Sequence, residues 1–241
     1  MLVPNSSKSK LMMFSSKPTH DLPDLVFANG TIEWVGEFKY LGLTLTNKLS
    51  FANHINRVAL NISRITGSFT NIRSIVPLQI LIKLYYALVF PHLINHVVIW
   101  GSAPQCHLKI IETRMNNLLR VILGVRWVDW RPEVNTVQLY KENNLLKLGN
   151  IFRLHLFKLL KQLLDGKFPD IYSLLLEPHL STRVHETRNS LFRHPALRCE
   201  VERRFLPHQL ITLFEQVNPD LLNLSENQSV RHFKGHLLTN Q

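Results

Sequence analysis

Apolar residues recur every three or four positions through the middle of the chain, a spacing typical of helices that bury one face. The clearest seam starts after Ser50 and proceeds at steps of four and three: Phe51, Ile55, Val58, Ile62, Ile65, Phe69 and Ile72. We expect Ser50 to cap this helix, the helix to end before Pro77, and Gly67 to weaken its second half. The pattern therefore predicts a helix of about three heptads.

Prolines and glycines divide the following sequence into further helices. Pro77 is expected to open a helix that continues through Leu88 and kinks or breaks at Pro91, because proline suits a first helical turn and disrupts an interior. Pro104 is expected to open another helix, which Gly124 ends. Both helices carry apolar seams and should pack against the first.

Two more helices are expected over residues 132–142 and 148–164. The second is apolar around most of its circumference, so we expect it to be buried among its neighbours. Residues 181–198 are polar and are expected to form a loop or linker, followed by two short helices near the C-terminus.

The first fifty residues are typical of strands rather than helices. Short apolar runs predict strands over 11–14, 25–27, 32–34 and 38–45. Asn29-Gly30 suits the tight turn of a hairpin, since both residues tolerate positive φ. We therefore expect a mainly α chain, in which a small antiparallel β-sheet over residues 1–49 precedes a helical bundle over 50–180 and a basic linker with C-terminal helices over 181–241.

Composition narrows the possible classes of protein. With 45% apolar residues, the 241-residue chain can build a core, which excludes disorder throughout. Its 28 Lys and Arg against 17 Asp and Glu give a net charge of +11, which favours polyanionic partners, either nucleic acid or an acidic membrane surface. The uncharged stretch between Lys83 and Lys109 is long enough to span a bilayer, but its prolines and polar residues interrupt it, so no stable membrane insertion is expected.

Only two cysteines occur, Cys106 and Cys199, and no signal segment opens the chain. A disulfide scaffold is therefore excluded, and an intracellular, reducing compartment is expected. Whether that compartment is the nucleus or the cytoplasm stays open.

The sequence contains little that could serve as an active site. Two-metal phosphoryl transfer needs carboxylates clustered around ions about 4 Å apart, and the six aspartates are dispersed along the chain. Histidine pairs spaced as on a metal-binding helix occur at His92 with His96 and at His232 with His236, but neither belongs to a metalloprotease motif. We therefore expect no catalysis, no metal site and no cofactor within this chain.

Basic residues near polar or aromatic ones suggest contact with nucleic acid. On the first long helix, Arg57, Asn61 and Arg64 share a face that could meet successive phosphates, although the same face could simply be solvated. A second and a third basic set lie further along the chain: Arg114, Arg120, Arg126 and Arg131 with Trp127 and Trp130, then Arg183, Arg188, Arg193 and Arg198. For the second set the alternative is that the tryptophans cap a helical core, and for the third that the segment is merely solubilising.

Several short motifs follow one another along the chain. The first is Asn5-Ser6-Ser7-Lys8-Ser9 before an apolar run, and the second is Phe38-Lys39-Tyr40-Leu41-Gly42. Further motifs come in this order: Leu49-Ser50-Phe51, His54-Ile55, Leu84-Tyr85, Pro91-His92-Leu93, Trp100-Gly101, Arg120-Val121-Ile122 and Phe233-Lys234. Together they resemble, in collinear order, the C-terminal part of the reverse transcriptases of non-LTR, LINE-type retrotransposons, and the second is similar to that family's best-known strand motif after the palm.

The resemblance implies a fragment of an RNA-directed DNA polymerase, with residues 1–49 as a palm remnant and 50–180 as a thumb-like region. By analogy Lys8 lies near the nucleotide site, and the helices embrace the template–primer duplex. The residues expected to approach the primer end are Phe38, Lys39, Tyr40, Leu41 and Gly42. The family's catalytic aspartates, which hold Mg²⁺, are expected upstream of Met1. The expected partner is RNA or DNA without sequence preference.

The alternatives are a non-enzymatic module that binds nucleic acid or another protein, and an inert transposon relic. In either case an exposed apolar surface would favour self-association. Residues 127–130 and the C-terminal fifth depart most from the family's pattern.

Overall fold

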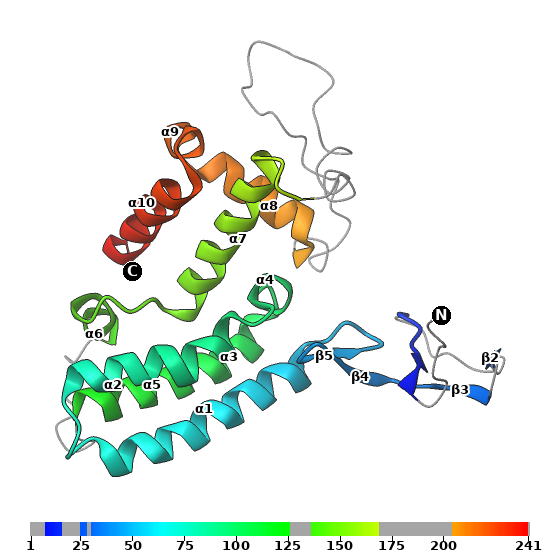
Figure 1. The fold of residues 1–241 in the computed structure, drawn as a ribbon, viewed down its shortest axis with the longest axis horizontal. Helices are drawn as coiled ribbons and strands as arrows, with labels where there is room; N and C mark the ends of the chain where they lie inside the picture. Colours follow the sequence, from blue (N-terminus) through cyan, green and yellow to red (C-terminus); the bar gives the residue numbers. More distant parts are fainter. Residues whose placement is uncertain (1–7, 16–24, 28–29, 126–135, 169–203, 241) are drawn as a thin grey trace, which may run out of the picture.

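The structure is a computed structural model that describes residues 8–15, 25–27, 30–125, 136–168 and 204–240. Short strands extend from one end of a group of packed helices (Figure 1). The expected fold class, mainly α with a small antiparallel sheet before the helices, is confirmed. No described helix has the length and apolar content that crossing a membrane would require.

The strands form two separate units. In the first, β3 (Gly30–Trp34) lies between β1 (Lys10–Leu11) and β2 (Leu25–Phe27), antiparallel to β2 and parallel to β1. In the second, β4 (Glu37–Tyr40) and β5 (Leu43–Thr46) form an antiparallel hairpin. Asn29, of the expected Asn-Gly turn, lies outside the described residues.

The single strand expected over residues 38–45 is wrong, because the chain reverses in its middle. Leu41 and Gly42 both take positive φ, 47° and 92°, as a two-residue hairpin turn requires. Glycine adopts such a backbone freely, whereas leucine does so only under strain. The Phe38–Gly42 motif therefore forms one strand and the turn of a hairpin.

The first long helix, α1 (Ala52–Ile72), forms as the seam predicts, and Gly67 does not interrupt it. Its N-cap is Phe51, so the expected cap at Ser50 is wrong by one residue. The backbone N–H and C=O of Ser50 are both bonded to the Thr46 hydroxyl, at 3.0 and 2.9 Å, which ties this residue to the end of β5.

The expected kink or break at Pro91 is replaced by a π-helical segment that precedes this proline. α2 (Leu78–Leu84) runs into a π-helical segment, η2 (Tyr85–Val89), and then into α3 (Phe90–Ile94), with Pro91 in the first turn of α3. A wider turn before a proline accommodates the missing N–H and the ring. The chain breaks later, at His96, which takes φ 55° and precedes the short α4 (Val97–Trp100).

Helix α5 (Gln105–Leu123) begins after Pro104 and ends at Gly124, as expected. Gly124 has φ 71°, and the N–H of Val125 donates to the Arg120 carbonyl at 3.0 Å, which closes the last turn. α1 and α5 pack along their length, and their apolar seams form much of the core. The fully buried side chains of this pair include Ile55, Ile62, Phe69, Ile111 and Leu118.

Helix α7 (Leu148–Leu164) follows α6 (Thr136–Glu142) and occupies the centre of the molecule (Figure 1). It packs against α3 and α4 and also against α8 (Leu206–Gln216) and α10 (Glu226–Thr239). The rings of Phe157 and Phe233 stack with centroids 4.3 Å apart. The expected burial of residues 148–164 is therefore confirmed. Where two short C-terminal helices were expected, the described residues form three, α8, α9 (Pro219–Asn223) and α10.

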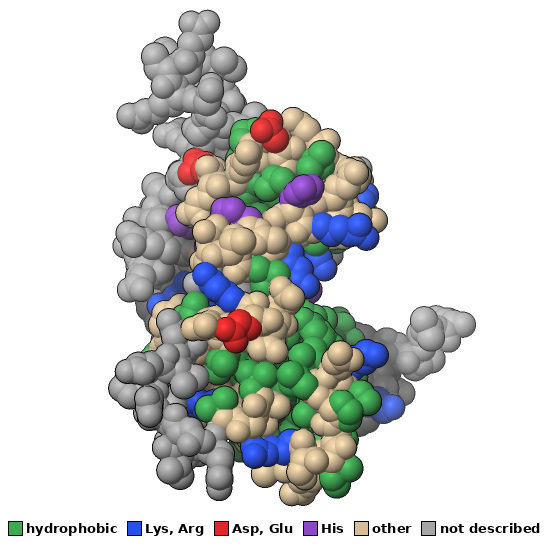
Figure 2. Space-filling model, turned by 90° about the vertical axis from the view of Figure 1, so that its left-hand side faces the viewer, with side chains coloured by type: hydrophobic (Ala, Val, Ile, Leu, Met, Phe, Trp, Pro, Cys, Tyr) green, Lys and Arg blue, Asp and Glu red, His purple; other side chains and the backbone are tan. Residues whose placement is uncertain are grey.

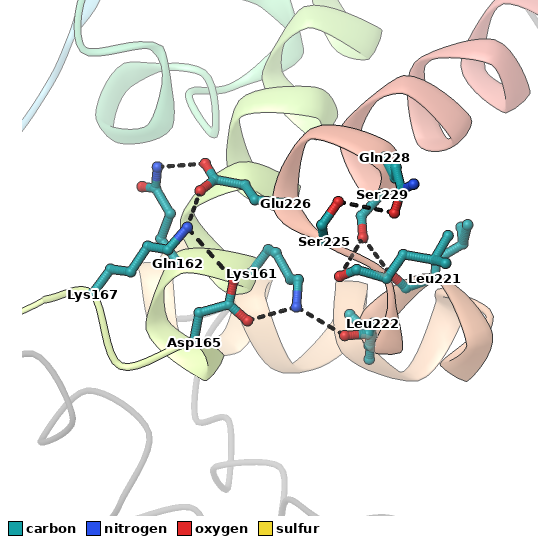
Figure 3. Close-up of polar contacts among 11 residues, drawn as sticks. Lys161, Gln162, Asp165, Lys167, Leu221, Leu222, Ser225, Glu226, Gln228 and Ser229 are labelled. Atoms are coloured by element: carbon teal, nitrogen blue, oxygen red, sulfur yellow. Dashed lines mark hydrogen bonds and ion pairs between the residues drawn. The ribbon is translucent and has the colours of Figure 1, made fainter.

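Polar contacts fix the end of α7 to the corner between α9 and α10 (Figure 3). The Lys161 ammonium is buried and donates to the Asp165 carboxylate at 2.5 Å and to the Leu222 carbonyl at 2.9 Å. Gln162 donates to Glu226 at 2.8 Å, and Lys167 forms an ion pair with the same carboxylate. These bonds join segments about sixty residues apart and so fix the C-terminal helices on the bundle.

Candidate nucleic-acid interface

The β4–β5 hairpin presents part of the Phe38–Gly42 motif to solvent. Lys39 and Tyr40 are exposed, and Leu41 at the turn is 73% exposed, whereas Leu43 and Thr44 are buried against the bundle. Phe38 is half-buried and faces a small apolar hollow of about 140 Å³ between the hairpin and the β1 segment, lined by Lys10, Met12, Phe14, Val35, Phe38, Tyr40 and Leu45. The hairpin thus combines a cationic side chain with exposed aromatic and apolar ones.

The basic face of α1 flanks the buried seam. Arg57, Asn61 and Arg64 follow one another at steps of four and three, so they share one face. Arg64 is exposed and the other two are half-buried. Seven residues correspond to about 10 Å along a helix, so the two guanidinium groups can reach different phosphates.

The hairpin adjoins this face at its N-terminal end. Asn53 lies four residues before Arg57 on the same side of α1, and its side-chain amide donates to the Glu37 carboxylate at the start of β4. In Figure 1 the hairpin accordingly meets the bundle where α1 begins. The structure therefore brings two of the expected contact regions, the motif and the α1 face, next to each other.

The second basic set does not come together as a cluster within the described residues. Arg114 and Arg120 are six positions apart on α5, which places them about 120° apart around the helix. Arg114 is exposed, whereas Arg120 donates to the Asn117 side chain at 3.1 Å and lies near Tyr140 of α6. The remaining members of the second and third basic sets lie outside the described residues: Arg126, Trp127, Trp130, Arg131, Arg183, Arg188, Arg193 and Arg198.

Lys8, expected near a nucleotide, is exposed just before β1. Its neighbour Lys10 forms an ion pair with Glu33 across the β1–β3 pair. Nothing among the described contacts joins Lys8 to the hairpin, so its role remains the one that the resemblance implies.

The histidine pairs differ in structure. His92 lies in α3 but His96 follows its end, so the helical spacing expected of that pair is broken, whereas His232 and His236 both lie exposed on α10. Within the described ranges, no three His, Cys, Asp or Glu side chains are grouped so that they could hold a metal ion.

A buried polar junction between the hairpin and the bundle was not foreseen as a site. His54 is 3% exposed, and its Nδ1 accepts from the Thr44 N–H at 3.4 Å. Burial, followed by electrostatic repulsion from Arg57 and His96, lowers the pKa of His54 to about 4. The sequence did hold a signal, because His54 precedes Val58 and Ile62 at steps of four, on the flank of the buried seam.

Comparison with known proteins supports the resemblance. The chain is 26% identical over 151 residues to the "Probable RNA-directed DNA polymerase from transposon X-element" of Drosophila melanogaster, covering 61% of this chain and 16% of that protein. It is 28% identical over 126 residues to the "RNA-directed DNA polymerase from mobile element jockey" of Drosophila funebris, covering 51% and 14%. The jockey protein of Drosophila melanogaster matches at 26% identity over 127 residues, with the same coverage.

No family model and no solved structure matches. The chain spans about a sixth or less of the relatives that it matches. The alternative of a non-enzymatic module that binds nucleic acid or another protein, or of an inert transposon relic, is not favoured. As its motifs predict, the chain resembles one region of the RNA-directed DNA polymerases, or reverse transcriptases, of non-LTR retrotransposons.

Proposed function

We propose that this chain binds a template–primer duplex of RNA or DNA without sequence preference, through the exposed side of the β4–β5 hairpin and the basic face of α1. The observation that carries the proposal is their adjacency: Asn53 bonds Glu37, so the hairpin adjoins the face that bears Arg57 and Arg64. The net charge of +11 adds a general attraction for polyanions. The relatives are named as RNA-directed DNA polymerases, whose templates are nucleic acids.

We further propose that the chain by itself does not add nucleotides to a primer and needs no cofactor to bind one. The dispersed aspartates support this, because two-metal catalysis needs clustered carboxylates. Duplex binding should therefore persist in EDTA. Nucleotide incorporation by the purified chain in Mg²⁺ would overturn the proposal that the chain does not add nucleotides. An intracellular compartment, nuclear or cytoplasmic, fits a chain with two cysteines and a nucleic-acid partner.

Fluorescence anisotropy of a labelled duplex over a series of salt concentrations tests binding. The logarithm of the association constant should fall linearly with the logarithm of salt concentration, and each duplex phosphate contact contributes about 0.9 to the slope. The Arg57→Gln/Arg64→Gln double variant should lower the slope by about 2 and weaken binding to unrelated sequences equally.

Arg231→Gln is the matched control, because Arg231 is an exposed arginine of α10, away from the hairpin and α1. It should leave the slope within about 0.5 of the unmodified value. A slope that is insensitive to salt, or equal losses in the α1 and α10 variants, would refute binding through the α1 face.

We also propose weak self-association through apolar side chains left on the surface. Figure 2 shows hydrophobic side chains gathered on the lower half of the face it draws. Large apolar residues exposed on α1, α2, η2 and the α1–α2 connection include Leu60, Ile75, Leu78, Ile80 and Leu88. Sedimentation velocity without nucleic acid should show association that Ile80→Lys reduces, and a strictly monomeric chain would contradict it.

A further inference from the structure

The β4–β5 hairpin is held to the helices by a small set of buried side chains. Thr44 of β5 is fully buried, and its backbone N–H donates to Nδ1 of His54 in the first turns of α1, at 3.4 Å. This bond requires the His54 ring to keep a lone pair on Nδ1, so the ring must be neutral. The bond joins the hairpin backbone to a helix side chain ten residues further along the chain.

The corner between α3 and α4 completes the junction. The His54 ring lies against the buried Trp100 ring, with centroids 5.7 Å apart, and the Trp100 indole N–H donates to the Asn95 carbonyl at 2.7 Å. The Asn95 side chain reaches the hairpin turn, since a Cβ on Gly42 would lie only 2.9 Å from its Nδ2. Residues from β5, α1 and the corner therefore enclose the base of the hairpin turn.

The junction carries polar and strained groups where a core has apolar ones. Three buried side-chain atoms, Thr44 Oγ1, His54 Nε2 and His96 Nδ1, have no hydrogen-bond partner among the described residues. Leu41 and His96 also take positive φ, an unfavourable backbone for residues other than glycine. Unpaired buried polar atoms and strain lower stability, and such features concentrate at functional sites.

We propose that His54 is a positioning residue, which orients the hairpin so that the exposed Tyr40 ring next to its turn faces the nucleic acid. The inference rests on the proposed function, because it concerns how the hairpin takes part in binding. The Nδ1 bond fixes the base of the β5 strand, and the Asn95 contact fixes the turn. The exposed side chains of the hairpin then add to affinity only while both contacts hold it in one orientation.

A double-mutant cycle between His54 and Tyr40 tests this coupling, with anisotropy of a labelled duplex at constant low salt. Tyr40→Ala removes an exposed ring and should weaken binding by the unmodified chain about fivefold or more. His54→Asn retains an acceptor near the Nδ1 position, so Tyr40→Ala should keep that effect. His54→Gln, of similar polarity, places its acceptor further out, and there Tyr40→Ala should have less than about a twofold effect.

Amide hydrogen exchange separates positioning from general loss of structure. In the His54→Gln variant, the segment 37–46 should exchange faster while α5 keeps its protection, and in His54→Asn both should keep it. If α5 also loses protection in His54→Gln while His54→Asn keeps it, His54 supports the bundle as a whole, and the specific positioning role is overturned.

Two outcomes distinguish the failures. If the unmodified chain binds duplex but Tyr40→Ala weakens all His54 variants equally, His54 does not position the hairpin and the proposed function stands. If the unmodified chain does not bind at low salt, the proposed function fails and the inference fails with it.

Discussion

The buried histidine at the hairpin junction predicts a specific loss of stability in mild acid. His54 has its pKa lowered to about 4, first by burial and then by the charges of Arg57 and His96. In the unfolded chain its pKa returns to 6.5. Between pH 6.5 and pH 4, His54 is therefore protonated in the unfolded state and neutral in the folded state. The free energy of unfolding should therefore be unaffected by this group above pH 6.5 and should fall as the pH drops from 6.5 towards 4.

The size of the effect follows from that difference in pKa. Proton linkage gives a loss of about 2 kcal/mol at pH 5 and about 3 kcal/mol once the pH is below 4. His155 acts in the same direction, because burial and the nearby Lys158 also lower its pKa to about 4. Its contribution is smaller than the pKa implies, since its ring is only half-buried and water screens it.

Urea unfolding followed by circular dichroism at pH 7.5 and pH 5 measures the effect. Carboxylates stay largely ionised at pH 5, so histidines dominate the change. The unmodified chain should lose about 2 kcal/mol more than His54→Asn between the two pH values, because asparagine keeps an acceptor for Thr44 but does not titrate. His155→Gln serves as the control and should retain most of the loss. Equal losses in the unmodified chain and His54→Asn would refute the reasoning.

Three further predictions concern other parts of the molecule. Gly67→Ala should raise the free energy of unfolding by about 0.5–1 kcal/mol, because a Cβ in the middle of α1 meets nothing within 4 Å. Gly101→Ala should lower it, because a Cβ there would lie 2.4 Å from the Val97 carbonyl oxygen and 2.5 Å from the Phe152 ring. Urea unfolding measures both, and stabilisation by both substitutions would contradict the packing. Lys161→Met should lower the free energy of unfolding by about 1–3 kcal/mol, because the Leu222 carbonyl loses its donor and Asp165 keeps only its more distant partner Lys167. No change in the urea midpoint would show that this network does not hold the C-terminal helices. Duplex binding measured by anisotropy at matched ionic strength should persist in EDTA, because the proposed contacts use arginine, lysine and aromatic side chains, and complete loss of binding on chelation would contradict them.

The sequence by itself determined the main helices. The seams of α1, α5 and α7 are local patterns, and each shows in the spacing of apolar residues whatever packs against them. The ends at Pro104 and Gly124 were equally readable, because proline and glycine act on the backbone of their own residues. The resemblance to reverse transcriptases also came from short motifs in the chain order, and comparison bore it out.

Local patterns misjudged the hairpin, because Leu41-Gly42 is not a customary turn pair and the apolar run 38–45 reads as one strand. Its reversal is fixed by contacts that the sequence does not display, the approach of Gly42 to Asn95 and the bond from Thr44 to His54. The same holds for the basic residues: spacing placed Arg57 and Arg64 on one face of a helix, but only the bond between Asn53 and Glu37 put the hairpin next to them. The spacing of apolar residues shows which side of a helix or strand is buried. Which elements then pack against each other depends on the whole core. For this reason the junction at His54, which brings together β5, α1 and the corner between α3 and α4, could be recognised only in the tertiary structure.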